Sequence, residues 1–247
     1  MENTMEIIEN NDVDTNNNNE NNDIKFRQSN NFIESRFSDF KLIELKVIEY
    51  LASQTKRTDI SYINDKMNKI VTIRLVDLSK LLDLHVEYMY QEANHIVEKL
   101  FVKYAQFKYQ DANGNIDYEL LHFIERVRYE NGVFTFEINH EVLHYFVNIK
   151  KDYTDINLKY IAALDSIYAI KMYKLLKQYQ GIKKREFNIE ELKTQLGIVD
   201  SYSKYSNFKK KVIDVFVNKI NENTDIYVEY VEIRTGKSVK SLMFKIN

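Results

Sequence analysis

The sequence of 247 residues predicts an α+β protein in which one order of elements occurs twice. Two long segments carry apolar residues at helical spacing, and each precedes a short β-like run, two further helical segments and strands joined by turns. Asn-Gly pairs, which are typical of hairpin turns, separate the strands of the first half. Helix, strand, helix, helix and hairpin is the order of a winged helix-turn-helix. We therefore expect tandem winged helix-turn-helix domains behind a disordered acidic N-terminal tail.

The tail differs in charge from the rest of the chain. Residues 1–24 contain seven acidic side chains and no basic one, and residues 16–22 are all Asn apart from Glu20. Such a segment cannot bury enough apolar surface to offset the entropy lost on ordering. We expect residues 1–30 to form a disordered tail.

The first winged-helix domain is expected over residues 31–150. Phe40, Ile43, Val47 and Leu51 form the apolar stripe of its first helix, with Ser38 or Asp39 as the cap. The pattern then predicts a strand at 71–75, a helix at 78–84 capped by Asp77, a helix at 86–100, strands at 101–107, 120–129 and 133–138, and a short helix at the end. Residues 150–157 are interpreted as a linker.

The second domain is expected over residues 151–247. Leu164, Ile167 and Leu175 lie on one side of a helix that ends at Gly181. The pattern further predicts a strand at 185–188, a helix at 189–198 that stops at Gly197, a longer helix from Ser206, and a terminal hairpin with strands at 226–233 and 237–246.

Composition excludes several kinds of site. The chain is 44% hydrophobic, with 18 Tyr and 14 Phe, which is enough to fill a core. It has no Cys, so disulfides, iron–sulfur clusters, thiolate zinc sites and cysteine nucleophiles are excluded. The sequence also lacks a run of about eighteen apolar residues and a basic-then-apolar leader. We expect a cytoplasmic protein without a membrane partner.

One motif suggests an enzyme. His140, Glu141 and His144 spell H-E-x-x-H, in which two histidines one helical turn apart bind zinc and the Glu activates water. A catalytic zinc also needs a third protein ligand. Val147 and Lys150 occupy the positions where one extended pattern requires Gly and His, and Asp165, the carboxylate about twenty residues on, looks like part of a helix cap. We expect no metal and no catalytic residues, and a zinc peptidase remains only as an alternative.

Charge indicates which half binds nucleic acid. Residues 151–247 carry a net charge of +6, whereas residues 25–150 carry −1. The second long helix of the C-terminal half has three lysines near its start, and its counterpart at 86–100 has Glu87, Glu92 and Glu98 against Lys99. The later helix of a helix-turn-helix enters the major groove by its N-terminal end, and the wing contacts the flanking backbone. The C-terminal helix is therefore the predicted recognition helix.

The candidate DNA-contacting residues follow from this geometry. They are Asn207, Lys209, Lys210 and Lys211 on the helix, Lys204 before it, Lys183, Lys184 and Arg185 before the strand, and Arg234, Lys237 and Lys240 at the hairpin. Lys210 and Lys211 are expected to make the closest contacts. Asp214, one turn further, would either repel a phosphate or accept a hydrogen bond from a cytosine amino group.

Several segments carry a family resemblance. "SIYAIKMYKLLKQY" (166–179), "FNIEELKTQLGI", "YSKYSNFKKKVIDVFVNKINENTDIYVEY" and "GKSVKSLMFKI" resemble the replication initiator proteins of iteron-containing bacterial plasmids. The likeness covers residues 150–247, and the tandem layout extends it back to about residue 36. The family's basic residues on the second recognition helix fall on Lys209, Lys210 and Lys211, where relatives often have Arg; Lys lacks the planar two-bond fork of Arg.

The resemblance implies an initiator that acts by binding, without a cofactor. Its C-terminal unit would bind double-stranded DNA at directly repeated origin sites. Its N-terminal unit would mediate a homodimer in equilibrium with monomer and, in monomers, would make further DNA contacts. Monomers would open an AT-rich segment and recruit the host initiator ATPase and the replicative helicase, and dimers would repress their own gene. The alternative is a transcriptional repressor or phage regulator with the same fold, because a fold does not fix a function.

Overall fold

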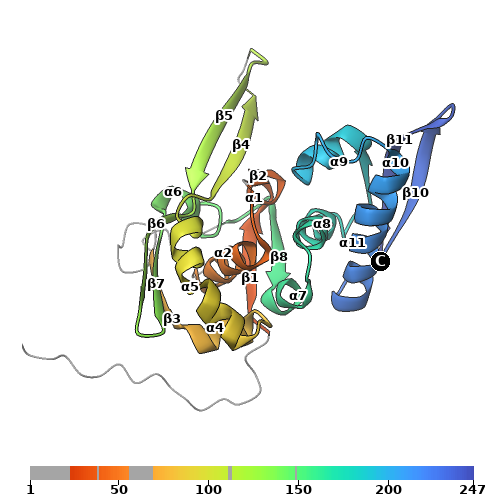
Figure 1. Cartoon of the computed structure of the whole chain (residues 1–247). Helices are drawn as coiled ribbons and strands as arrows, with labels where there is room; N and C mark the ends of the chain where they lie inside the picture. Colours follow the sequence, from red (N-terminus) through yellow and green to blue (C-terminus); the bar gives the residue numbers. More distant parts are fainter. Residues whose placement is uncertain (1–22, 38, 56–68, 111–112, 148) are drawn as a thin grey trace, which may run out of the picture.

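The computed structural model describes residues 23–247 except 38, 56–68, 111, 112 and 148 (Figure 1). Within these residues the strands form four small antiparallel sheets, and helices pack between and around them. No described helix combines the length and the hydropathy that a membrane crossing requires. Residues 1–22 of the tail predicted at 1–30 lie outside the described residues, so the disorder expected for them stays a prediction.

The first unit follows the predicted order with shifted boundaries. Its elements are α2 (Leu42–Gln54), β3 (Ile70–Arg74), α4 (Leu75–Leu81), α5 (Val86–Leu100), β4 (Tyr104–Gln110), β5 (Ile116–His122), β6 (Ile124–Glu130), β7 (Val133–Ile138) and α6 (His140–Leu143). The hairpin turn at Asn131 and Gly132 is confirmed, since both have positive φ, 51° and 77°.

Two predicted caps are wrong. The N-cap of α2 is Lys41, whose backbone N–H donates to Glu44 Oε2 at 2.8 Å, so the helix begins later than Asp39. Ser38, the other predicted cap, lies outside the described residues. Helix α4 begins at Leu75, with Asp77 in its first turn and paired to Arg74 at 2.6 Å.

The predicted strand at 120–129 is two strands in two different sheets. β5 pairs with β4, and β6 pairs with β7. Phe123 lies between them, is buried, and packs edge-on against Phe32, Phe37 and Phe40. Its burial turns the chain between the two sheets.

The first described strand, β1 (Lys25–Ser29), and its partner β8 (Tyr153–Asn157) were not predicted from local sequence patterns. β1 lies in the segment assigned to the tail, and β8 lies in the supposed linker. The two strands pair, with Phe26 opposite Ile156 and both side chains buried. The tail therefore ends before residue 25, because the alternating side chains of 25–29 bury one face. α1 (Asn30–Glu34) and β2 (Arg36–Phe37) follow β1.

Besides β8, the second half contains the predicted elements and one more. They are α7 (Leu158–Ala163), which was not predicted, α8 (Ile167–Lys177), β9 (Lys184–Asn188), α9 (Ile189–Gln195), α10 (Tyr205–Phe208), the π-helical turn η2 (Lys209–Ile213), α11 (Asp214–Asn223), β10 (Val228–Thr235) and β11 (Ser238–Ile246). Gly197, with φ +69°, ends α9 as predicted. α8 ends four residues before Gly181, and Lys183 takes the left-handed conformation instead (φ 63°).

Helix α8 lies between the two halves of the molecule (Figure 1). Eight of its eleven residues are buried, including Lys171 and Lys174. Lys174 donates to Glu49 of α2 and to Gln28 of β1, and all three side chains are buried. Lys171 donates to the backbone carbonyls of Ile33 and Ser35. These contacts tie the start of the chain to the second half.

Candidate nucleic-acid interface

The predicted recognition helix is a continuous helical segment with a π-helical turn inside it. α10, η2 and α11 follow one another from Tyr205 to Asn223. The buried residues are Phe208, Val212, Ile213, Phe216, Val217 and Ile220. A regular helix predicts Val215 on this face, but Val215 is 37% exposed and Val217 is 9% exposed. The wider π turn shifts the register of the buried face after residue 209.

The exposed side of this segment carries the predicted contact residues. Asn207, Lys210 and Lys211 are exposed, and the structure gives their side chains no ion pair with a described residue. Lys204, the N-cap residue of α10, is also exposed. The first turns of the helix therefore present ammonium and amide groups to solvent, as a major-groove reader must.

Lys209 lies on the inner side, against the wing. Its Nζ donates to Glu232 Oε1 at 2.8 Å and lies 5.7 Å from the centre of the Tyr230 ring. Asp214 accepts a hydrogen bond from Tyr230 Oη at 2.5 Å. Both contacts link the helix to β10, and Asp214 Oδ1 therefore has a partner within the protein.

The wing is the hairpin of β10 and β11, turned at Gly236 (φ +60°). Lys237 and Lys240 are exposed there, and Arg234 pairs with Glu232. A groove of about 560 Å³ is lined by residues of the wing, of α9 and of α10. Its lining includes Lys193, Ser203, Arg234, Lys237 and Lys240, and also the acidic Glu190. This cationic groove, next to the recognition helix, suits the backbone of a nucleic acid.

The three basic residues at the start of β9, of which Lys183 precedes the strand and Lys184 and Arg185 lie within it, separate into two groups. Lys183 and Lys184 are exposed, in agreement with a surface role. Arg185 is 8% exposed; it donates to Glu34 at 2.7 Å and to the Leu175 carbonyl at 2.8 Å, and its guanidinium lies 4.3 Å from the Phe187 ring centre. A phosphate cannot reach its guanidinium without breaking these contacts, so the prediction that Arg185 contacts DNA is wrong.

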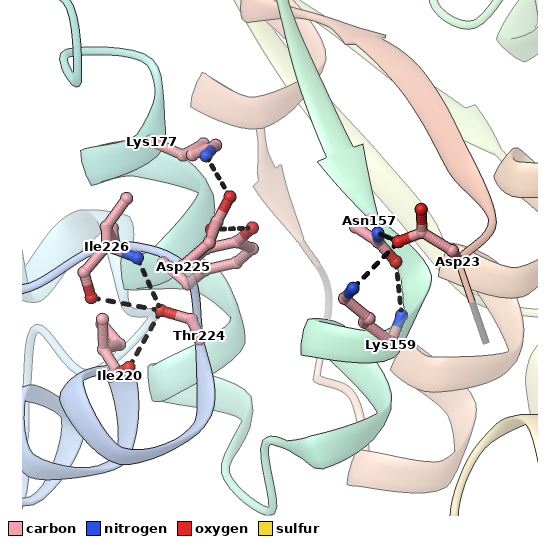
Figure 2. Close-up of polar contacts among 9 residues, drawn as sticks. Asp23, Asn157, Lys159, Lys177, Ile220, Thr224, Asp225 and Ile226 are labelled. Carbon is pink, nitrogen blue, oxygen red and sulfur yellow. Dashed lines mark hydrogen bonds and ion pairs between the residues drawn. The ribbon is translucent and has the colours of Figure 1, made fainter.

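The far end of the recognition helix is fixed to α8 (Figure 2). Thr224 Oγ1 donates to the Ile220 carbonyl at the end of α11. The next residue, Asp225, accepts from Lys177 at 2.5 Å and from Tyr173 at 3.0 Å, both on α8. The position of the helix is thus set by α8 at one end and by the wing at the other.

A second groove, of about 720 Å³, lies between the β1–β8 sheet and the end of α8. Its lining includes Lys25, Arg27, Lys159, Lys177, Asp23 and Asp225. Several of these charges are paired: Lys159 donates to Asp23 at 2.9 Å, and this bond lowers the pKa of Asp23 (Figure 2). The positive potential in this groove is therefore weaker than the number of its basic residues indicates.

The H-E-x-x-H residues lie together at the surface. α6 is four residues long, His140 Nδ1 is 3.2 Å from Glu141 Oε1, and ligand atoms of His140, Glu141 and His144 lie within 4.8 Å of one another. These three could hold a divalent metal ion. Asp165, the candidate third ligand of a peptidase zinc, instead pairs with Lys219 of α11, which lowers the pKa of Asp165. Asp165 is therefore paired with α11 and does not join the two histidines as a third ligand.

Comparison with known sequences assigns both halves to one family. The sequence profile described as "Initiator Replication protein, WH1" matches residues 25–177, and "Initiator Rep protein, WH2" matches residues 188–246. The two profiles confirm two winged-helix domains in an α+β chain. The first profile extends past the predicted boundary at residue 150 and includes β8, α7 and α8.

A solved structure with a TM-score above 0.5 shares this fold. The crystal structure of the Pi initiator protein in complex with iteron DNA matches with a TM-score of 0.65 at 17% identity, over 91% of this chain and 97% of that chain. Domains 2 and 3 of RctB match with a TM-score of 0.48 at 10% identity, over 86% and 85% of the two chains. Because the identity is 17%, the match to Pi shows a shared fold over both domains and no more than the fold.

Proposed function

The chain belongs to the family of plasmid replication initiators, and from this membership we propose that it binds directly repeated origin sites, or iterons, through its C-terminal winged-helix domain. The observation that supports this proposal is the exposed row of Asn207, Lys210 and Lys211 on the recognition helix beside a cationic wing. The Pi initiator, which shares the fold of both domains, was crystallised with iteron DNA.

In the proposed complex the recognition helix lies in the major groove. Lys210 and Lys211 reach the base edges, where Lys can bridge guanine O6 and N7, and Asn207 can pair with adenine N6 and N7. Lys204, Lys237 and Lys240 contact phosphates of the flanking backbone, with Lys183 and Lys184 as outer contacts. The reaction class is binding without catalysis, and no cofactor takes part.

We propose that residues 31–150 chiefly mediate protein contacts. On β5, an edge strand of its sheet, Ile116, Tyr118 and Leu120 are each about half exposed, which suits a homodimer surface in equilibrium with monomer. We further propose that the monomer opens AT-rich origin DNA and recruits the host initiator ATPase and the replicative helicase, and that the dimer represses its own gene. This work takes place in the cytoplasm, where plasmid DNA lies.

The testing experiment is a footprint and mobility shift of the purified protein on DNA upstream of its gene, at two salt concentrations with random competitor DNA. We expect protection of regularly spaced direct repeats. Protection of a single inverted repeat would replace the initiator proposal with the repressor alternative, and absence of specific protection would overturn both. The Lys80→Ala/Lys99→Ala double variant, which removes two exposed charges from the first unit, serves as the charge-matched control for variants of the recognition helix.

A further inference from the structure

One acidic residue of the wing contacts three donors from the DNA-binding surface. Glu232, on β10, accepts from Tyr205 Oη at 3.0 Å and from Lys209 Nζ at 2.8 Å, both on Oε1. Its Oε2 accepts from Arg234 Nη2, two residues further along the same strand. Tyr205 and Lys209 belong to the recognition segment, and Arg234 belongs to the wing.

We propose that Glu232 is a specificity-determining residue of this DNA-binding domain, because it holds Lys209 and Arg234 against the protein and so withholds two cations from sequence-independent phosphate contact. This inference rests on the proposed function, and it deepens it by assigning the control of specificity to a residue that does not face the bases.

The exposed fractions of the three side chains support this assignment. The Glu232 side chain is 15% exposed, whereas those of Lys209 and Arg234 are 40% and 55% exposed. The carboxylate thus lies beneath two cations that solvent, and a DNA phosphate, can still reach. A phosphate that binds either cation must compete with a carboxylate already in hydrogen-bonding position.

The charge of the cluster supports it as well. Lys209, Arg234 and Glu232 together carry +1, where the two cations alone would carry +2. The hydrogen bond from Lys209, with those from Arg234 and Tyr205, lowers the pKa of Glu232 to about 2, so the carboxylate is ionised throughout the physiological range. The restraint is therefore constant and does not depend on ordinary changes of pH.

The neighbouring cations have no such restraint. Lys210 and Lys211 are exposed on the outer side of the same π turn, without an ion pair to a described residue. These four cations of the domain therefore form two pairs. Lys209 and Arg234 are restrained near the wing, and Lys210 and Lys211 are available to the major groove of DNA. Non-specific affinity depends on the number of phosphates neutralised, whereas discrimination depends on base contacts. Restraining Lys209 and Arg234 therefore lowers the non-specific affinity and leaves the base contacts of Lys210 and Lys211 in place.

The test is the Glu232→Gln variant, measured by fluorescence anisotropy on origin and random duplexes across a salt series. Each further phosphate that the released cations neutralise should steepen the salt slope by about 0.9 and raise affinity for random DNA by about five- to tenfold near 0.1 M salt. Affinity for the origin should rise less, so the ratio of the two affinities should fall. Glu229→Gln, which removes the same charge from an exposed position of the same strand, is the matched control and should change the ratio little.

A double-mutant cycle with Lys209→Ala separates the restraint by Glu232 from general support of the fold. Lys209→Ala should weaken binding to random DNA more in the Glu232→Gln background than in the wild type, because only there is Lys209 released. Equal effects in the two backgrounds would overturn the inference. So would a Glu232→Gln variant that weakens both duplexes in proportion, or one that matches Glu229→Gln. Since random DNA reports on the restraint, a wild type without repeat protection would reject the proposed function separately.

Discussion

Lys209, Lys210 and Lys211 are consecutive lysines that the structure places in different surroundings. Lys209 donates to Glu232, whereas Lys210 and Lys211 are exposed on the outer face. The same contrast separates Arg185, which is buried against Glu34, from Lys184 beside it. The charge of a residue therefore does not define its role; its partner inside the protein decides whether it is available to DNA.

Lys210→Ala and Lys211→Ala should each weaken binding to the origin site by about 1 to 3 kcal/mol if the side chain contacts a base. The preference at one base position should relax at the same time. A phosphate contact would instead weaken all sequences alike and lower the salt slope by about one unit. Mobility shifts on single-base variants of the site distinguish these results, and unchanged binding in the double variant would refute the assignment of this helix.

The buried Lys171 predicts a pH dependence of stability. Burial, with Lys174 nearby, lowers its pKa to about 7, from 10.5 for an unperturbed Lys. Between these values the unfolded chain binds a proton that the folded chain has released, so stability rises with pH. The free energy of unfolding is lowest below pH 7, where Lys171 is protonated in both states. It then rises with pH by at most about 1.4 kcal/mol per pH unit. Lys46, whose pKa burial also lowers, acts with the same sign.

Urea unfolding of the wild type and of Lys171→Met between pH 6.5 and about 9.5 tests this expectation. The variant should show a shallower rise in the free energy of unfolding. Parallel curves for the two proteins would mean that Lys171 keeps its proton in the folded state.

At the scale of elements, the recognition segment is the least regular helix of the domain. The π turn η2 lies where the lysines do, between α10 and α11. It sets the faces that follow it, so that Val217 packs inward and Val215 remains at the surface. π turns are frequent at functional sites, and here the turn directs Lys209 to the wing and its two neighbours to solvent.

Val217→Ala should therefore lower the free energy of unfolding by about 1 to 2 kcal/mol, because it removes buried methyl groups. Val215→Ala, the same change two residues earlier, should alter it by less than about 0.5 kcal/mol. Thermal or urea unfolding measures both. The opposite ranking would mean that the helix is regular through residues 209–213.

The sequence predicted correctly those helices and turns that depend on residues close together in the chain. α5 was predicted with its bounds, and the Asn131-Gly132 and Gly197 signals were correct, because periodicity and turn chemistry are local. β1 and β8 were missed because each is a strand only through the other, with about 128 residues between Arg27 and its partner Asp155. The exposure of Lys210 and Lys211 followed from the helix face. The partners of Lys209 and Arg185 did not, since Glu232 and Glu34 are brought to them by tertiary packing.

At the scale of the whole molecule, α8 is a shared core element of the two domains. It reaches Glu49, Ile33 and Ser35 in the first half through Lys174 and Lys171. It reaches Asp225, at the end of the recognition helix, through Tyr173 and Lys177. Through these contacts α8 links the end of the predicted recognition helix to the first domain.

Lys174→Met should destabilise the protein by about 3 to 5 kcal/mol, because it leaves the Glu49 carboxylate buried without a cation. Lys177→Met, on the same helix, removes a partly exposed pair with Asp225 and should lower stability by at most about 1 kcal/mol. Urea midpoints compare the two. The double variant Lys174→Met/Glu49→Gln should recover part of the loss, and a Lys174→Met protein as stable as Lys177→Met would refute the buried charge pair.

The pairing of β1 with β8 has a consequence for synthesis. The ribosome makes Phe26 long before Ile156, its partner across the sheet. Contacts between residues so far apart in sequence form late, since the intervening loop must first be closed. The nascent first domain therefore remains incomplete until translation has passed residue 157, and its open strand edge is exposed to other chains in that interval. Strand β8, which the WH1 profile includes, therefore completes the sheet that β1 begins at the other end of the same domain.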